Sequence, residues 1–200
     1  MIIGIDFDNT VACYDGVFYR AALDRGLIPS DLSSSKNSVR DHLNATGQNE
    51  LFTELQGYVY GHRMDLVAPY PGFSNFIFAS RISQHQLYIV SHKTRFPIVG
   101  PRYDMHAAAR KFLTDHNLIG DHAIAEDHIF FELTKEEKIK RAAKLKVDIF
   151  IDDLPEILSM DGFPTTCKKI LFDPNLYHQN ECRFSRGHDW DQLQAMVHQC

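Results

Sequence analysis

Several side chains that could bind or transfer a phosphate group follow apolar stretches of this sequence. Three apolar runs are followed at once by such residues, namely Asp6 and Asp8, then Ser91, then Asp152 and Asp153. Two carboxylates about 4 Å apart repel each other by roughly 4 kcal/mol at an effective dielectric constant near 20. Four carboxylates gathered in one place therefore predict a bound cation.

The types of donor indicate which cation and which substrate such a site would take. Oxygen donors favour a hard cation, and a site that leaves positions for water and a phosphate suits Mg²⁺ better than Ca²⁺. Lys138 adds an ammonium and Ser91 a hydroxyl. We interpret the set as a receptor for a phosphoryl group, where a carboxylate can attack the phosphorus atom.

Alternating strands and helices would bring these residues to one place. Apolar, β-branched or aromatic runs predict five strands, over Ile2–Ile5, Gln86–Val90, His128–Phe131, Asp148–Ile151 and Lys169–Phe172. Between them, helical patterns cover Phe73–Ser83, Tyr103–His116 and Lys135–Leu145. This alternation predicts an α/β fold with a doubly wound parallel sheet, in which ligands bind at the carboxyl ends of the strands.

The stretch after the first strand interrupts this alternation. It contains no strand-like run, and its helical patterns are clearest over Phe18–Arg25 and Asn49–Tyr60. The segment Ala68–Gly72 then marks a return to the core through its prolines and glycine. We therefore predict a core made of residues 1–10 and 69–200, with residues 11–68 forming a small inserted helical cap domain.

Composition excludes several classes of protein. Of the 200 residues, 44% are hydrophobic, so a long disordered chain is excluded, and 26 acidic against 21 basic residues argue against binding of long nucleic acid. Because no apolar run approaches the roughly 20 residues that span a bilayer and no basic leader is visible, we expect no membrane association. The four cysteines show no CxxC spacing, which favours reduced thiols and a cytoplasmic location.

The order of the motifs resembles that of the haloacid dehalogenase-like (HAD) superfamily. Asp6-Phe7-Asp8-Asn9-Thr10 resembles its first motif and Ile89-Val90-Ser91 its second. Lys138 resembles the third, and Ile149-Phe150-Ile151-Asp152-Asp153 the acidic fourth. The resemblance covers nearly the whole chain and implies a Rossmann-like core with a phosphoric monoester hydrolase activity.

The resemblance also implies a role for each residue. Asp6 would attack phosphorus to give an aspartyl-phosphate, while Asp8 would protonate the leaving oxygen and then activate water. Asp8 needs a pKa above about 3.9 for this, which neighbouring carboxylates and partial burial can supply. Mg²⁺ would be held by Asp6, the backbone carbonyl of Asp8 and the pair Asp152 and Asp153, with Asp153 favoured as the direct ligand.

The remaining site residues are predicted to bind the substrate. The resemblance implies that Ser91 hydrogen-bonds the phosphoryl group and that Lys138 neutralises it, with Lys135 on the same segment as the alternative lysine. His92 and Lys93 lie beside Ser91 and are predicted to hold an anionic substrate, although a solvated loop is equally consistent with them. Asp152 and Asp153 also suit the start of a helix.

A small cap implies a small phosphorylated metabolite as substrate. The chain resembles the 5'(3')-deoxyribonucleotidase group in the size of its cap and in four segments, Cys13–Phe18, His92–Phe96, Leu171–Asp173 and Asp189-Trp190. It departs from that group at two places. It has Asn9-Thr10 where the group more often has Gly-Val, and Ser91-His92-Lys93 where the group more often has Thr-Ser-Pro. A nucleotide and a sugar phosphate both remain open, as do phosphoryl transfer and a protein that binds a phosphometabolite without catalysis. A phosphatase acting on the ends of DNA or RNA is disfavoured by the acidic charge.

Overall fold

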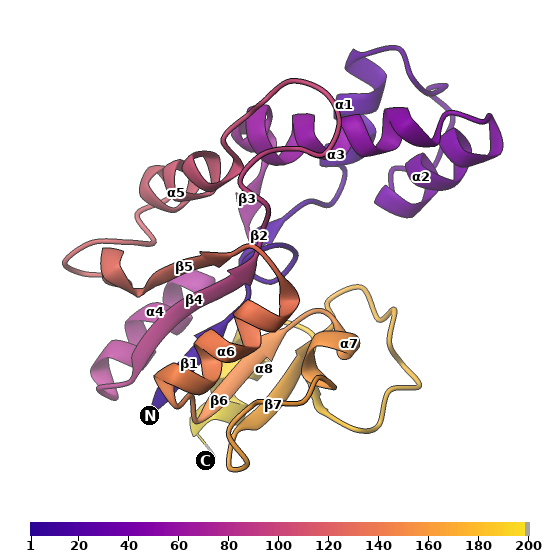
Figure 1. Ribbon diagram of the computed structural model, residues 1–200. Helices are drawn as coiled ribbons and strands as arrows, with labels where there is room; N and C mark the ends of the chain where they lie inside the picture. Colours follow the sequence, from indigo (N-terminus) through magenta and orange to yellow (C-terminus); the bar gives the residue numbers. More distant parts are fainter. Residues whose placement is uncertain (199–200) are drawn as a thin grey trace. The chain divides into compact units, whose positions relative to one another are not determined.

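The computed structural model describes residues 1–198, which form two compact units (Figure 1). The first unit contains residues 1–12, 69–93 and the chain from His116 onward, and the second contains residues 13–68 and 94–115. The chain crosses between the units at two short paired strands, β2 (Ala12–Cys13) and β3 (Ala68–Pro69), and again on either side of residues 94–115. The sequence assigned that last segment to the core, whereas the structure places it in the second unit.

A six-stranded sheet forms the centre of the first unit. Its strands are β1 (Ile2–Ile5), β4 (Gln86–His92), β5 (Ile129–Glu132), β6 (Ile149–Asp152), β7 (Lys168–Phe172) and β8 (Ser185–Gly187). The order is β5-β4-β1-β6-β7-β8, and every neighbouring pair is parallel. The predicted doubly wound parallel sheet is confirmed, and β8 is an additional strand that the sequence did not predict.

Helices cover both faces of this sheet. Figure 1 shows α6 (Lys135–Leu145) on one face and α4 (Phe73–Ile82) on the other. On the α6 face, Val90, Phe150 and Leu171 pack with helical side chains that include Leu158 of α7 (Pro155–Leu158). On the α4 face, the ring of Trp190, the first residue of α8 (Trp190–His198), lies 4.6 Å from that of Phe73 and 4.8 Å from that of Phe76. Both faces of the sheet are thus apolar, which explains the near-continuous apolar runs of the strands.

A short 3-10 turn, η2 (Glu126–His128), precedes β5.

The second unit is helical. It contains α1 (Val17–Asp24), α2 (Lys36–Ala45), α3 (Asn49–His62), the 3-10 turn η1 (Met64–Leu66) and α5 (Met105–Asp115). Helix α3 contacts each of the three other helices. The ring of Phe18 is fully buried and packs 5.6 Å from that of Tyr60 and 6.1 Å from that of Phe52. Helix α2, which the sequence left within a polar stretch, is closed at its start by the hydroxyl of Ser35, which accepts a hydrogen bond from the N–H of Ser38.

No helix among residues 1–198 is both long enough and apolar enough to span a membrane. Cys167 and Cys182 are free cysteines, and Cys200 lies outside the described residues.

We predict that Gly57→Ala destabilises the protein although the residue lies inside a helix. Alanine normally stabilises a helix interior by about 0.5–1 kcal/mol relative to glycine. A Cβ atom at Gly57 would lie only 2.5 Å from Cβ and 2.7 Å from Cγ of Pro97, however. We expect a loss of about 1–3 kcal/mol in the free energy of unfolding, measured by urea denaturation. Glu50→Ala, at an exposed position of α3, is the control, and a stabilised Gly57→Ala variant would contradict the close packing.

Candidate active site

The register of the sheet brings the first and last acidic motifs together. Strands β4, β1 and β6 are neighbours, and Ile5 of β1 pairs with Ile151 of β6. The next residues along these strands are Asp6 and Asp152, and the N–H of Asp6 donates to the carbonyl of Ile151 over 2.9 Å. Parallel strands present their carboxyl ends at the same edge, so these two side chains meet there.

A buried lysine joins the two carboxylates. The Nζ atom of Lys138 lies 2.5 Å from an oxygen of Asp6 and 2.6 Å from an oxygen of Asp152, and the lysine side chain has no exposed surface. Lys135, the alternative, is 42% exposed, and its Nζ lies 3.5 Å from Glu156. Of the two lysines, the structure therefore pairs Lys138, and not Lys135, with Asp6 and Asp152.

Asp153, which follows Asp152, adds a third carboxylate to those of Asp6 and Asp152. Asp6, Asp152 and Asp153 each offer one carboxylate oxygen, and these three atoms lie within 4.8 Å of one another. Three carboxylates against one ammonium leave two negative charges, which a dication would balance. An all-oxygen set with few protein ligands fits Mg²⁺, which keeps positions for water and phosphate. Asp152 also accepts a hydrogen bond from the N–H of Leu154 over 3.0 Å. Leu154 is the residue at the start of α7, and no side chain of the described residues caps that helix.

Burial dominates the electrostatics of this group. It raises the pKa of Asp152 to about 7, although the ammonium of Lys138 acts in the opposite direction. Burial and the charges of Asp152 and Asp6 raise the pKa of Asp153 well above its usual range. Burial also opposes the charge on Lys138, but the carboxylates of Asp152 and Asp6 outweigh it and hold the pKa of the lysine above its ordinary value. A bound dication would favour the ionised carboxylates, because opposite charge stabilises the charged form.

Asp8 lies in a tight turn after β1 and forms an ion pair. The N–H of Asn9, which has a left-handed φ of 57°, donates to the carbonyl of Ala12, and the N–H of Val11 donates to that of Phe7. The Nζ of Lys93 lies 2.8 Å and 2.7 Å from the two carboxylate oxygens of Asp8. The sequence predicted neighbouring carboxylates around Asp8 and a substrate contact for Lys93. The contact between the two was not foreseen.

Ser91 and His92 present polar atoms without a partner. The Oγ of Ser91 and the Nδ1 of His92 are buried and make no hydrogen bond with any described residue. Buried polar atoms are nearly always hydrogen-bonded in native proteins, so such atoms require an explanation. Burial, followed by the charge of Lys138, lowers the pKa of His92, which favours a neutral imidazole. Both residues lie at the carboxyl end of β4, where an anion would give the Ser91 hydroxyl an acceptor.

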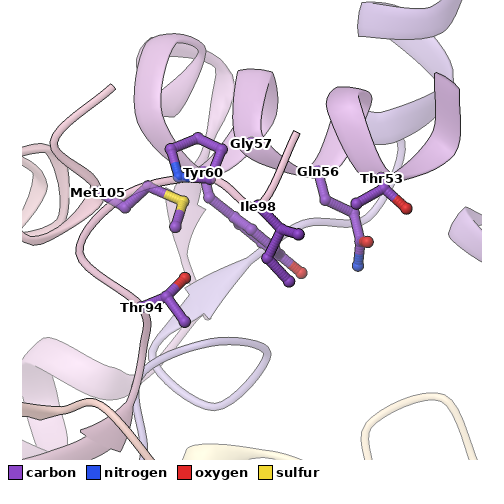
Figure 2. Close-up of a pocket in the computed structure, with 8 residues that line it drawn as sticks. Thr53, Gln56, Gly57, Tyr60, Thr94, Ile98 and Met105 are labelled. Carbon is purple, nitrogen blue, oxygen red and sulfur yellow. The ribbon is translucent and has the colours of Figure 1, made fainter. Parts of the chain in front are cut away.

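A separate pocket lies within the second unit (Figure 2). One wall is a face of α3, on which Thr53, Gln56, Gly57 and Tyr60 follow helical spacing, and the other wall comes from the segment after β4. The described residues that line it are Thr53, Gln56, Gly57, Tyr60, Thr94, Pro97, Ile98 and Met105, and none of these is Asp, Glu, Lys or Arg. Sequence reasoning did not identify this pocket. The spacing on α3 was visible, but it is equally typical of core packing.

Solved structures share this fold. A structure described as a predicted phosphatase from Clostridium acetobutylicum matches with a TM-score of 0.63 and 15% identity, over 100% of this chain and 98% of that one. A HAD-superfamily hydrolase from Ehrlichia chaffeensis matches with a TM-score of 0.58 and 11% identity, over 99% and 96%. A HAD hydrolase from Bacillus subtilis, YfnB, whose structure is described as bound to magnesium, matches with a TM-score of 0.53 and 12% identity, over 98% and 97%. The chain therefore has the fold of the HAD-superfamily hydrolases.

The sequence comparisons are more distant. No protein-family model matches the chain. A curated protein of Oceanobacillus iheyensis, named "Putative nucleotidase", is 23% identical over 121 residues. The match covers 60% of this chain and spans 57% of the length of that relative.

We predict that Mg²⁺ stabilises the protein through the three carboxylates. A ligand that binds only the folded state raises its stability with concentration, so Tm should rise as Mg²⁺ is added. Asp153→Asn should need at least about tenfold more Mg²⁺ for the same rise in Tm, because it removes one charged donor without disturbing the ion pairs of Lys138. The measurement is thermal unfolding followed by circular dichroism. Asp161→Asn, at an exposed position, is the matched control, and an equal Mg²⁺ response in both variants would argue against this site.

Proposed function

We propose that the protein is a Mg²⁺-dependent phosphatase that hydrolyses a small phosphate monoester through an aspartyl-phosphate. The observation that supports this most directly is the gathering of Asp6, Asp152, Asp153 and Lys138 at one edge of the sheet, as the acidic set and ammonium that phosphoryl transfer needs. The buried Ser91 hydroxyl, which has no protein partner among the described residues, adds a donor to the same edge. A cytoplasmic location is part of the same proposal.

In the first step, a carboxylate oxygen of Asp6 attacks phosphorus, and the bond between phosphorus and the leaving oxygen breaks. Asp8 gives its proton to that oxygen, so an alcohol departs and Asp6 carries the phosphoryl group. Lys138 faces Asp6 and supplies positive charge where negative charge develops on the phosphoryl oxygens. Ser91 donates its hydroxyl hydrogen to one of these oxygens.

In the second step, Asp8 takes a proton from water, whose oxygen attacks the phosphorus atom. The bond between phosphorus and Asp6 breaks, which releases inorganic phosphate and restores both carboxyl groups. Asp6, Asp152, Asp153 and the backbone carbonyl of Asp8 would hold Mg²⁺. When bound, Mg²⁺ would supply charge stabilisation for the phosphoryl oxygens.

A nucleotide is the substrate that we favour. The pocket of the second unit combines an apolar wall with the amide of Gln56 and two threonine hydroxyls, a lining that suits a planar base with a few hydrogen-bonding edges. The curated relative named as a nucleotidase points to the same substrate class. A sugar phosphate is the second candidate, since four polar side chains also line the pocket.

The proposed activity predicts Mg²⁺-dependent phosphate release that disappears in Asp6→Asn. Purified protein would be given a panel of nucleoside monophosphates and sugar phosphates, with Mg²⁺ or with EDTA, and inorganic phosphate would be measured. We expect kcat to fall by at least about 10⁴-fold in Asp6→Asn, because the nucleophile is lost. The unfolding midpoint of this variant would confirm that it is folded.

Other outcomes have distinct meanings. Full activity in Asp6→Asn would exclude the aspartyl-phosphate. Phosphate that appears on an added alcohol rather than on water would indicate phosphoryl transfer. A protein that binds these compounds without releasing phosphate would be a binding protein instead of an enzyme.

Gln56→Leu tests the assignment of the pocket to the base. We expect KM for the preferred nucleotide to rise by about tenfold, the worth of one neutral hydrogen bond, while kcat stays within about twofold. KM for 4-nitrophenyl phosphate, which has no base to place there, should stay unchanged in the same variant. Thr114→Val, which alters an exposed residue of α5 outside the pocket, is the control. Equal KM changes for both substrates would refute a role in reading the base.

A further inference from the structure

The ion pair between Lys93 and Asp8 is built into the core of the first unit. Lys93 is one residue beyond β4 and its side chain is only 3% exposed, whereas the side chain of Asp8 is 22% exposed. Its ammonium contacts both oxygens of the Asp8 carboxylate at hydrogen-bonding distance. A buried ammonium is stable only when it is paired, so this contact constrains both side chains.

Both ends of this ion pair are fixed by the backbone. The N–H of Lys93 donates to the carbonyl of Glu132 over 2.7 Å, which ties the end of β4 to the end of β5. Asp8 belongs to the hydrogen-bonded turn between Phe7 and Ala12, where the N–H groups of both Val11 and Ala12 donate to the carbonyl of Phe7. The Nζ of Lys93 also lies 5.6 Å from the centre of the Phe7 ring. A charged contact between two fixed backbones sets the direction in which the carboxyl group points.

The geometry points to Lys93 as a positioning residue that aims Asp8 at the leaving oxygen, instead of a ligand of the phosphate. This inference rests on the proposed function, in which Asp8 is the acid and base. Lys93 and Lys138 form separate contacts, because Lys138 faces Asp6 and Asp152 while Lys93 faces Asp8. The two ammonium groups therefore have different roles in one reaction.

The proton balance leaves Lys93 unchanged. In the structure the Lys93 ammonium contacts both oxygens of the Asp8 carboxylate. When Asp8 is protonated, one oxygen keeps its hydrogen bond from Lys93, while the oxygen that carries the proton gives up this contact and faces the leaving oxygen. In the second step the same oxygen receives a proton from water. Lys93 donates hydrogen bonds only and takes no part in the proton transfer.

This role predicts a loss of activity that depends on the leaving group. Alkyl phosphates need a proton on the departing oxygen, whereas 2,4-dinitrophenol leaves as a stable anion. We expect Lys93→Met to lower kcat on the preferred nucleotide by about 10²–10³-fold, within the usual contribution of a general acid, with KM nearly unchanged. Formation of the aspartyl-phosphate from 2,4-dinitrophenyl phosphate, measured as the burst of released dinitrophenolate, should slow by less than about tenfold, since this leaving oxygen needs no proton from Asp8.

The comparison of two substrates within one variant separates chemistry from folding. A partly unfolded preparation lowers both rates by the same factor, so their ratio reports only the leaving-group effect. Lys93→Arg keeps a cation against Asp8 and should fold if Lys93→Met does not. It should show a smaller loss with the same dependence on the leaving group, because the guanidinium places its donors differently. Lys111→Met removes an exposed lysine and is the matched control.

A double-mutant cycle completes the test. Asp8→Ala should show the same preference for the dinitrophenyl ester, and Lys93→Met added to it should cause little further loss, since a positioning residue acts only through the residue it positions. Equal losses on both substrates through a raised KM would make Lys93 a phosphate ligand and overturn the inference. Phosphate release that is normal in wild type and in Lys93→Met would overturn it as well. If wild type releases no phosphate from either compound while Mg²⁺ binds, the proposed function fails, and the inference with it.

Discussion

The contact of Lys138 with Asp6 and Asp152 is the interaction on which the site depends. Two carboxylates at the ends of neighbouring strands would repel each other strongly in a buried environment, and the ammonium between them removes much of that cost. This contact requires α6 to pack on the sheet so that the side chain of Lys138 reaches Asp6 and Asp152. It also requires β1 and β6 to keep their register, because a shift of one residue would turn Asp6 to the other face. Fold and site therefore share one constraint.

Lys138 and Lys93 form ion pairs with different aspartates, so the charged residues of the site fall into two groups. Lys138 lies with the acidic residues that would hold Mg²⁺ and the phosphoryl group, and Lys93 lies with Asp8. Two aspartates only two residues apart in the sequence thus meet different partners. Under the proposed mechanism, this difference would let chemically identical side chains take the roles of nucleophile and of acid and base in one reaction. Successive side chains point in opposite directions at the end of β1, and the chain then turns at Asn9. Together these two features separate the side chain of Asp6 from that of Asp8.

Much of this arrangement was predictable from the sequence, and the gaps have physical causes. The five apolar strands were found because burial on both faces leaves a continuous apolar run. Strand β8 was missed because Ser185-Arg186-Gly187 has no such run, and its position at the sheet edge does not demand one. The sequence could not decide whether Lys138 or Lys135 reaches the acidic site, because the answer depends on which face of α6 turns toward that site. The pairing of Lys93 with Asp8 joins residues that are far apart in sequence, and only the sheet order reveals it.

Residues 94–115 have a consequence for how this protein can be taken apart. The second unit is assembled from two stretches of chain, and helix α5 of the later stretch packs on α3 of the earlier one. A protein engineer who exchanges residues 13–68 alone for those of another protein would leave α5 facing a foreign helix, with Gly57 and Pro97 no longer matched. A working chimaera must transplant both stretches together. The second unit is therefore a discontinuous module, and its two stretches of chain have to be changed together.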